Sequence, residues 1–512
     1  MKEPPSPGTD ERPFGGRPPG RGWKLGRLLQ AVPGAVLEGA AATEISSLAC
    51  DSRRVQPGAL FFALPGGTTD GSLYIEDAVR RGAVAVVCEK GVRVGNGPAA
   101  VRVERPRLAM ADLAAEFHGH PSQRLQVIGI TGTNGKTTTA FMVREILRAA
   151  GVATGLLGTI HYEFGGRHLP ASRTTPEAPD LQQMLAEGLL GGDRAMAMEV
   201  SSQGLAAERL RATRFAAAVF TNLTVDHLDF HRTMEEYYGA KKRLFEALAA
   251  QSSAAPAIVN LDDAYGRRLA GEGYLADRLI SYGVQAKAAV RAVDLRCGER
   301  RSIFQVVTPW GECGVDLAFP GRFNISNALA AMAVGGAQGV TPAAMAEALR
   351  QMPPVPGRLE RIADPRGGRH LFVDYAHTED ALRNVLATLR ETIPGRLLCV
   401  FGCGGNRDRD KRPRMGSAVS ELADHAFVTS DNPRGEEPEA ILADILAGMD
   451  PAKPRTIEPD RATAIRAALR ETQSGETLLV AGKGHETYQE TGGRMVHFDD
   501  REVLREALAE GI

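Results

Sequence analysis

The sequence lacks an excess of either charge, since its 512 residues carry a formal net charge of −1. Such a balance supplies no electrostatic footprint for DNA, RNA or an anionic membrane. Long apolar runs are also missing, and no stretch approaches the roughly 20 residues that a membrane-spanning helix needs. The first 22 residues hold six prolines and five glycines without an apolar core segment. They therefore do not read as a secretory signal, and we predict a disordered tail, with a proline-motif ligand as the weaker alternative.

Cysteine is scarce, and its six occurrences show no metal-finger spacing. Cys399 and Cys403 are four residues apart around an apolar strand and a glycine turn, which does not match a redox pair. In a chain of this size without a signal segment, we expect the thiols to be reduced and mostly buried. The predicted compartment is cytoplasmic.

The length and composition predict several globular domains. Hydrophobic residues make up 43% and charged residues 24% of the chain, as in ordinary globular proteins. A chain of this length should split into about three domains. The clearest linker is the proline-rich segment 353–357, because proline ends the preceding helix and stiffens the join. We predict a tail at 1–22 and domains at 23–122, 123–353 and 354–512.

Short apolar strands alternate with helical patterns through most of the chain. The expected strands lie at 59–64, 83–87, 100–103, 125–130, 154–159, 195–200, 217–221, 257–260, 371–374, 397–401, 425–429 and 477–481. This alternation predicts an α/β fold, with a mainly parallel, doubly wound sheet in the second domain and an open α/β domain in the third. Residues 284–320 lack the alternation and are expected to form a small β-rich patch.

A glycine-rich turn lies between the apolar strand at 125–130 and an amphipathic pattern at 138–148. Backbone N–H groups and the positive end of a helix favour an anion at such a turn. Lys136 adds a cation for the terminal phosphates, and Thr137 adds a hydroxyl for magnesium. Isoleucine at 130 replaces the first glycine of the strict motif, so this is a variant loop. A chance match in an ordinary turn is the alternative, which the flanking strand and helix disfavour. The predicted ATP-binding residues here are Gly132, Thr133, Asn134, Gly135, Lys136, Thr137 and Thr138.

Polar residues follow the strands at 195–200 and 217–221. Ligands of open parallel sheets bind beyond the carboxyl ends of the strands, where Glu199 and His227 fall. Both could reach the phosphate loop and bind magnesium directly or through water. Each residue alone is more simply a hydrogen-bonding loop residue, but their shared position beside the loop favours the metal site.

Six segments occur in one particular order along the chain. They are Gly-Thr-Asn-Gly-Lys-Thr at 132–137, Glu-Val-Ser-Ser at 199–202, Thr-Asn-Leu-Thr-Val-Asp-His at 221–227, Phe-Asn-Ile-Ser-Asn at 323–327, Pro-Gly-Arg at 356–358 and Asp-Tyr-Ala-His at 374–377. This order resembles the Mur ligase family, whose enzymes build the peptide stem of bacterial peptidoglycan. The resemblance runs from Asp51 to beyond Glu486. It implies a small N-terminal α/β domain that binds UDP-sugar, a central P-loop ATPase-type domain and a C-terminal Rossmann-like domain that binds the amino acid. We expect a monomer, although the sequence does not determine the oligomeric state.

The resemblance implies roles for the ATP and metal residues. Lys136 resembles the lysine that contacts the β- and γ-phosphates, and Thr137, Glu199 and His227 resemble metal-site residues. The remaining residues expected to position ATP are Asn324, Asn327, Arg358 and Asp374. Because the last two come from the third domain, domain closure is implied, which would exclude water from a hydrolysable intermediate.

Lys241 has two interpretations. By itself it is a helix lysine on the surface, but its position resembles the lysine that the family carboxylates with CO2. The resulting carbamate is an anion that can bridge a second magnesium ion. Lys242 is adjacent, and one residue along a helix points to a different face, so only one of the two fits. We favour Lys241.

The nucleotide-sugar site rests on the resemblance alone. Ser52 lies in the segment 51–53, expected near the uracil and ribose, with 66–68 close by. The residues expected to hold the muramoyl-dipeptide are Thr174, Thr175, Ser201 and Arg209. Arg173, Gln203 and Ala207 depart from the family pattern, which puts individual contacts in doubt and not the reaction.

The third amino acid of the peptide stem is predicted from a second group of residues, in the C-terminal part of the chain. Asp431, Asn432, Pro433 and Arg434 resemble the signature of the family branch that adds meso-diaminopimelate. A guanidinium can bind the distal carboxylate of diaminopimelate through two parallel hydrogen bonds. L-lysine lacks that carboxylate and would leave the guanidinium unpaired. The other residues expected to hold the amino acid are Arg407, Gly482 and Glu486. A simple turn at 432–434 and a simple strand exit at 482–486 are the alternatives, and Asn406 is a minor departure from the pattern.

These features predict an ATP-dependent amide ligase that uses Mg²⁺ and a carbamate on Lys241. Its substrates would be UDP-N-acetylmuramoyl-L-alanyl-D-glutamate, ATP and meso-diaminopimelate, joined through an acyl phosphate. The same reaction with L-lysine is the first alternative. Folylpolyglutamate synthetase chemistry is a second, and a nucleotide-binding protein that has lost catalysis is a third. No nucleic-acid or membrane partner is expected.

Overall fold

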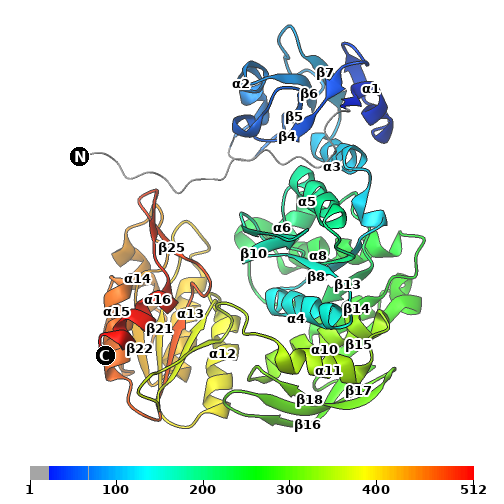
Figure 1. The fold of residues 1–512 in the computed structure, drawn as a ribbon. Helices are drawn as coiled ribbons and strands as arrows, with labels where there is room; N and C mark the ends of the chain where they lie inside the picture. The colour runs from blue at the N-terminus through cyan, green and yellow to red at the C-terminus, as the bar shows by residue number, and fades with distance from the viewer. Residues whose placement is uncertain (1–21, 67–68) are drawn as a thin grey trace. The chain divides into compact units, whose positions relative to one another are not determined.

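The computed structural model describes residues 22–66 and 69–512 (Figure 1). The predicted tail, except Gly22, lies outside the described residues, as do Gly67 and Thr68 of the expected nucleotide-sugar segment. The chain forms two compact units. The first comprises the described residues up to 125, together with 176–192 and 207–213, and the second comprises 126–175, 193–206 and 214–512. The domain boundaries expected from the sequence remain a prediction.

The first unit contains a five-stranded sheet in the order β2-β7-β6-β5-β4. Its strands are β2 (Val36–Glu38), β4 (Ser47–Ala49), β5 (Ala59–Phe62), β6 (Ala83–Glu89) and β7 (Ala99–Val103). All pairs are parallel except β2 with β7. A two-stranded sheet joins β1 (Trp23–Lys24) to β3 (Glu44–Ile45). The helices are α1 (Leu25–Leu28), α2 (Ile75–Arg80), α3 (Pro106–Phe117) and α5 (Ala178–Leu190), and α5 packs against α3.

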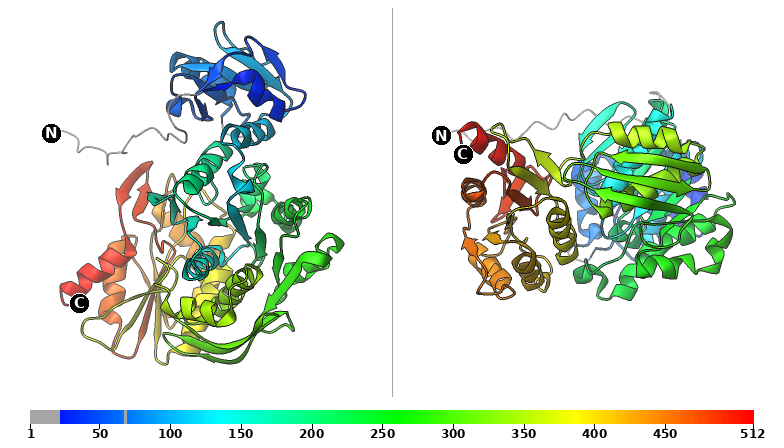
Figure 2. Two further views of the ribbon diagram at one scale, coloured as in Figure 1. Left: turned by 45° about the vertical axis from the view of Figure 1, so that its right-hand side comes forward. Right: turned by 90° about the horizontal axis from the view of Figure 1, so that it is seen from below.

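The second unit contains an eleven-stranded sheet in the order β11-β10-β9-β12-β8-β13-β14-β15-β16-β17-β18. Its strands are β8 (Gln126–Thr131), β9 (Thr154–Leu157), β10 (His161–Phe164), β11 (Arg167–Pro170), β12 (Ala195–Glu199), β13 (Ala217–Phe220), β14 (Ala257–Asn260), β15 (Leu279–Gly283), β16 (Val290–Cys297), β17 (Ser302–Thr308) and β18 (Gly311–Leu317). All neighbouring pairs in the run β9-β12-β8-β13-β14-β15-β16 are parallel, which confirms the expected parallel sheet. The antiparallel strands β16 to β18, green in Figure 2, confirm the β-rich patch.

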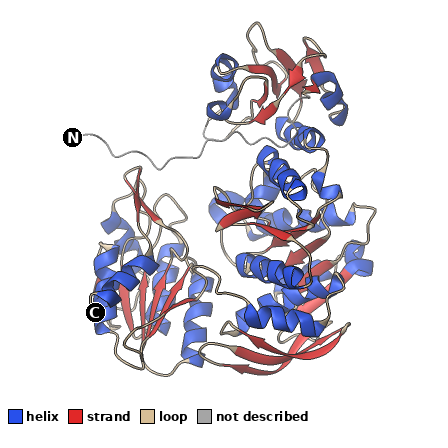
Figure 3. Cartoon of the chain, viewed as in Figure 1, coloured by secondary structure: helices blue, strands red, loops and turns tan. Residues whose placement is uncertain are grey.

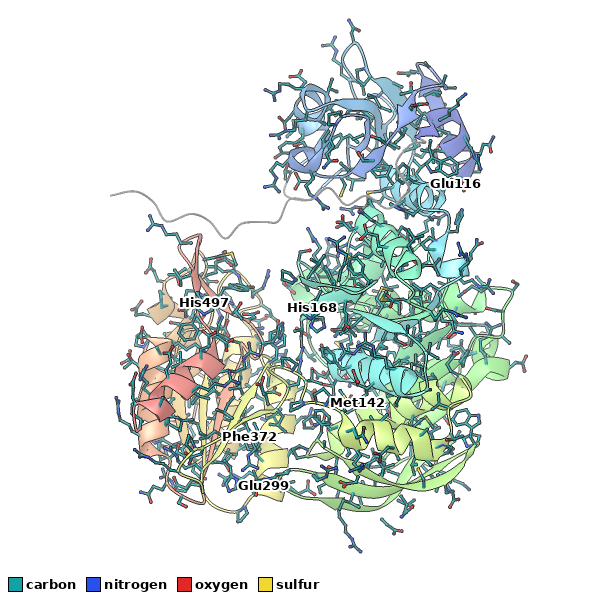
Figure 4. The ribbon with its side chains drawn as sticks, in the orientation of Figure 1. Glu116, Met142, His168, Glu299, Phe372 and His497 are labelled. Carbon is teal, nitrogen blue, oxygen red and sulfur yellow. The ribbon has the colours of Figure 1, made fainter. Side chains whose placement is uncertain are left out.

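Helices cover this sheet. They are α4 (Lys136–Ala149), α6 (Ser202–Ala206), α7 (Leu228–His231), α8 (Met234–Ala249), α9 (Ala264–Ala270), α10 (Arg322–Ala337) and α11 (Pro342–Gln351). Helix α4 packs against α10 and α11, and its Met142 lies in their shared apolar core with Ile128 and Ile130 of β8 (Figure 4). No helix among the described residues is both long and apolar enough to cross a membrane.

The second unit also contains a six-stranded sheet in the order β19-β20-β24-β21-β22-β23. Its strands are β19 (Glu360–Ile362), β20 (His370–Asp374), β21 (Leu397–Phe401), β22 (His425–Val428), β23 (Arg455–Ile457) and β24 (Thr477–Ala481). Only β19 runs antiparallel to its neighbour among these strands. The strands, red in Figure 3, lie between helices, as expected for a fully buried parallel sheet.

Two apolar clusters fill the two faces of this sheet. One contains Phe372, labelled in Figure 4, with residues of α12 (Glu379–Thr392), α13 (Lys411–Leu422) and α14 (Pro438–Leu446). The other contains residues of α15 (Arg461–Glu471) and α16 (Asp500–Ala509). A hairpin of β25 (Tyr488–Thr491) and β26 (Arg494–His497) follows β24.

A buried ion pair joins the beginnings of α15 and α16. The side chains of Arg461 and Asp500 are both 0% exposed, and two guanidinium nitrogens donate to the carboxylate at 2.7 Å each. The same guanidinium donates to the Ser430 carbonyl beyond β22 at 3.2 Å and to the Ala481 carbonyl of β24 at 2.9 Å. The pair therefore holds the loops after β22 and β24 at a fixed separation.

Replacing Asp500 with alanine is expected to reduce the free energy of unfolding of the six-stranded sheet by about 3–5 kcal/mol, because Arg461 would remain charged and unpaired in the interior. The urea midpoint, followed by circular dichroism, measures the change. The control is Glu347→Ala, which removes a half-exposed pair with Arg350. It should cost no more than about 1 kcal/mol. Equal shifts in the two variants would contradict the structural role of Asp500.

Candidate functional site

The glycine-rich loop at 132–137 connects β8 to α4. Gly135 lies at the helix start with φ of 84°, and an added Cβ would lie 2.3 Å from the Asn327 side-chain oxygen. Glycine is therefore required there both by conformation and by space. Nζ of Lys136 donates to the carbonyls of Gly132 at 2.9 Å and of Thr133 at 2.8 Å, so the ammonium lies over the loop. Burial lowers the pKa of Lys136, and the Glu199 carboxylate opposes this change.

Glu199 ends β12 beside this loop and is 1% exposed. Its carboxylate accepts hydrogen bonds from the Thr137 hydroxyl at 3.0 Å, from the Thr159 backbone N–H at 2.8 Å and from the Thr159 hydroxyl at 3.1 Å. The sequence analysis missed Thr159. Its place just after β9, which neighbours β12, is the signal that would have pointed to it.

His227 lies after β13, with Nε2 at 3.4 Å from the Asp226 carboxylate. Burial lowers the pKa of His227, Asp226 opposes this, and the cations of Lys136 and Lys241 add to it. The ring centres of His227 and Tyr237 are 6.0 Å apart, and the Tyr237 hydroxyl is 3.2 Å from the Thr133 hydroxyl, so His227 lies close to the phosphate loop. Among the described residues, no three His, Cys, Asp or Glu side chains form a ready-made metal cluster. A hydroxyl and a carboxylate beside a phosphate loop nevertheless fit Mg²⁺, which usually combines one or two carboxylates with phosphate oxygens and water.

Lys241 of α8 reaches the same loop. Its side chain is buried, Nζ donates to the Gly132 carbonyl at 2.7 Å, and the Tyr237 ring centre lies 4.5 Å away. Burial lowers the pKa of Lys241 well below its usual value, and the Lys136 cation adds to this. Lys242 instead pairs with Glu272 at 2.7 Å. The two lysines point to different surroundings, as the helix geometry predicts.

The predicted ATP residues approach the loop from α10 and from the segment after the 353–357 linker. Asn327 accepts from the Thr139 hydroxyl at 3.4 Å and donates to Asn324 at 3.3 Å. A guanidinium nitrogen of Arg358 donates to the Thr137 hydroxyl at 2.9 Å. Asp374 accepts backbone hydrogen bonds from residues 359 and 376, so its side chain shapes its own loop.

The residues expected to bind the muramoyl-dipeptide divide between the two units. In the second unit, Thr175 donates to the Glu199 carbonyl at 2.9 Å and accepts from the Ser201 backbone N–H at 3.0 Å. Thr174 is 3.1 Å from the Thr159 hydroxyl, so all three lie beside Glu199. Ser52 and Arg209 belong to the first unit, where Ser52 is buried and Arg209 pairs with Glu177 at 2.8 Å.

The residues expected to bind the amino acid follow β22 and β24 of the six-stranded sheet, except Arg407, which follows β21. The carboxyl ends of these parallel strands bring the segment 431–434 beside Gly482 and Glu486. Asn432 donates to the Glu486 carboxylate at 3.0 Å. Gly482 has φ of 116°, and an added Cβ would lie 2.8 Å from the Asp431 carboxylate. Close approach of the two loops therefore depends on glycine.

Arg434 is held from several sides. Its Nε is 3.3 Å from the Glu490 carboxylate, and Nη1 donates to the Gly405 carbonyl at 2.9 Å. A Cβ on Gly404 would approach both this guanidinium and the Arg407 side chain, so the predicted Arg407 lies near Arg434. Glu490, on β25, was missed, because the hairpin at 488–497 was not predicted.

All six cysteines are free thiols, as expected. Cys88, Cys399 and Cys403 are buried, and the other three are partly buried. Burial raises the pKa of Cys403 to about 12, so its thiol is held in the protonated, unreactive form.

Comparison with known proteins identifies the family. Three family models match the chain: the Mur ligase family catalytic domain at 44–118, the Mur ligase middle domain at 130–335 and the Mur ligase glutamate ligase domain at 357–484. The UDP-N-acetylmuramoyl-L-alanyl-D-glutamate--2,6-diaminopimelate ligase of Geobacter metallireducens is 44% identical over 506 residues, covering 95% of this chain and 98% of that protein. The ligase of the same name from Thermosynechococcus vestitus is 45% identical over 472 residues, covering 91% and 94%.

Solved structures agree with the sequence comparison. A ligase of that same name is 31% identical, with a TM-score of 0.64, and the match covers 94% of this chain and 99% of that chain. MurF from Acinetobacter baumannii has a TM-score of 0.69 at 20% identity, covers 96% and 99%, and shows the shared fold. The predicted α/β class and family resemblance are confirmed, and the chain belongs to the Mur ligase family.

Proposed function

We propose that this chain is an ATP-dependent ligase that adds meso-2,6-diaminopimelate to the D-glutamate of UDP-N-acetylmuramoyl-L-alanyl-D-glutamate during peptidoglycan synthesis. Relatives that are 43–45% identical over nearly their whole length carry the corresponding name. The observation that carries the choice of amino acid is the meeting of Arg434, Asn432 and Glu486 at one edge of the six-stranded sheet. The cytoplasmic location and the monomeric state are part of the proposal.

In the proposed reaction, the D-glutamate side-chain carboxylate attacks the γ-phosphorus of ATP, giving an acyl phosphate and ADP. An amine of diaminopimelate then attacks the acyl carbon, and inorganic phosphate leaves. Lys136 neutralises charge on the transferring group, and backbone N–H groups of 132–137 hold the phosphates. Thr137 and Glu199, with His227 directly or through water, would hold Mg²⁺, which supplies charge neutralisation. No side-chain nucleophile is required.

Lys241 is proposed to carry a carbamate. The depressed pKa of its amine leaves an unprotonated nitrogen that can attack CO2, forming an N–C bond and releasing a proton. The product is an anion close to the Gly132 carbonyl and the Lys136 ammonium. Its negative charge would favour a cation at this place. Burial of Lys241 against the phosphate loop supports this role over that of a surface lysine.

Selection of diaminopimelate over lysine is proposed to depend on Arg434. Wild-type enzyme given ATP and the UDP-muramoyl-dipeptide should release phosphate with meso-diaminopimelate and much more slowly with L-lysine. Arg434→Ala should raise the KM for diaminopimelate about 10- to 100-fold, because a charge-assisted hydrogen bond is lost. Arg494→Ala, at the exposed start of β26, is the control. Equal wild-type rates with the two amino acids would contradict the choice of substrate. No release with any amino acid would favour a binding protein that has lost catalysis.

Lys241→Ala should reduce kcat by at least about 100-fold, with no recovery on adding bicarbonate, because the metal-site anion is lost. Lys242→Ala is the matched control and should retain activity, since the Lys242 ammonium pairs with Glu272 and not with the loop carbonyl that Lys241 contacts. Wild-type protein in ¹³C-bicarbonate should show a carbamate resonance by NMR that Lys241→Ala lacks and Lys242→Ala keeps. Full activity of Lys241→Ala, or an unchanged resonance, would overturn the carbamate assignment.

A further inference from the structure

Lys483 is a fully buried lysine that the proposed reaction does not use. It follows Gly482 in the loop after β24, and its side chain is 0% exposed. Nζ donates to the Asn432 side-chain oxygen at 3.1 Å and to the Glu486 carboxylate at 3.3 Å. The Tyr488 ring centre lies 5.5 Å away. A buried ammonium requires such partners, and both hydrogen-bonding partners are residues expected to bind the amino acid.

The lysine determines which end of the Asn432 amide faces Glu486. Oδ1 of Asn432 accepts from Lys483 and from the Glu490 backbone N–H at 3.0 Å. With two donors at the oxygen, the NH2 group turns to Glu486, to which it donates at 3.0 Å. One of the two N–H groups of the Asn432 amide is thereby directed to Glu486, and these partners fix the amide in a single orientation.

The contacts of Lys483 differ from those of the other buried cation nearby. Arg461 bonds to Asp500 and to two backbone carbonyls, so it holds the loops together. Lys483 bonds to side chains on two different loops, 431–434 and 482–486. Its removal therefore acts on the orientation and charge of those side chains.

The charges around Glu486 make one cation necessary. Burial raises the pKa of Glu486, the Asp431 carboxylate raises it further, and Lys483 opposes both. The other groups facing this carboxylate are the Asn432 amide, the phenols of Tyr375 and Tyr488, and the more distant Arg461 guanidinium, which is committed to Asp500. The Arg434 guanidinium, which donates to the Asn432 carbonyl, pairs with Glu490. Without Lys483, the neighbouring carboxylates of Glu486 and Asp431 would lose the one cation that donates directly to Glu486 among the described residues.

We propose that Lys483 is a positioning residue of the amino-acid site, which keeps Glu486 as a carboxylate and orients Asn432 without itself contacting the substrate. The inference rests on the proposed function, in which Glu486 holds an ammonium of diaminopimelate. The direction of the pH dependence of amino-acid binding follows from the charges. As the pH falls, a carboxylate with a raised pKa is protonated earlier and loses its charge. Removing Lys483 raises that pKa further, so affinity for the amino acid should be lost at a higher pH than in the wild type.

The test measures KM and kcat for diaminopimelate against pH in Lys483→Met. The KM should rise about 10- to 100-fold near neutral pH, with a smaller effect on kcat, and the KM values for ATP and the UDP-muramoyl-dipeptide should stay within about twofold. The pH below which the KM rises should move upward. Lys453→Met is the control, since this exposed lysine precedes β23 and lies in a turn. It should match the wild type.

A double-mutant cycle separates positioning from general support of the fold. If Lys483 acts through Glu486, then Lys483→Met should change the KM less than about threefold in a Glu486→Gln background, so that the two effects are strongly non-additive. Lys483→Gln keeps a hydrogen-bond donor for Asn432 without the charge. This variant should fold even if methionine disrupts the site. It should show the same upward shift in the pH profile, with a smaller rise in the KM than Lys483→Met.

Three outcomes overturn the inference. The first is an unchanged pH profile in both Lys483 variants, and the second is additive effects in the double-mutant cycle. The third is an equal rise in the KM for all three substrates. If the wild type and Arg434→Ala behave as described above, any of these outcomes rejects the role of Lys483 and leaves the proposed function standing. If the wild type does not use diaminopimelate, the proposed function and the inference both fail.

Discussion

The carboxylate of Glu199 is the interaction on which the ATP end of the site depends. It is buried at the carboxyl edge of the eleven-stranded sheet and accepts hydrogen bonds from Thr137 and from both donors of Thr159. A buried charge without such donors would be costly, so the loop after β9 and the start of α4 are constrained to meet at this point. The Thr159 hydroxyl also lies 3.1 Å from Thr174. The expected metal residue and an expected dipeptide residue thus share one hydrogen-bonded network.

The six-stranded sheet uses the same geometry with different charges. Parallel strands β22 and β24 are separated only by β21 in the sheet and end at the same edge, so their loops converge. Arg461, which pairs with Asp500, donates to backbone carbonyls of both loops. Lys483 donates to side chains that project from the loops. Buried ionic groups frequently cost stability compared with apolar packing, and here their partners are loops that carry the proposed specificity.

Much of the fold followed from sequence periodicity. The parallel strands were predicted because apolar runs of four to six residues between helical patterns are typical of buried strands. The run at 125–130 became the strand at 126–131, and the run at 477–481 kept its bounds. Helix geometry separated Lys241 from Lys242 before any contact was known. The hairpins at 161–170 and 488–497 were missed, since their alternation is short: only Tyr162 and Phe164 of the first are buried, and no residue of the second is. Thr159, Lys483 and Glu490 were missed because their significance depends on long-range contacts that no local pattern contains.

Amino-acid selection depends on how rigidly Arg434 is held. An arginine free to swing into water would lose little when the substrate lacks a distal carboxylate, and it would discriminate weakly. Arg434 instead has φ of 56°, contacts Glu490 through Nε and donates to the Gly405 carbonyl through Nη1. Its backbone donates to the Glu490 carbonyl and accepts from Gly492, so the β25–β26 hairpin fixes it from outside. A guanidinium fixed before binding loses little conformational entropy when a carboxylate arrives. The same rigidity keeps it in place, with a hydrogen-bond donor unpaired, when lysine arrives, which is how a polar site rejects an analogue that lacks one group.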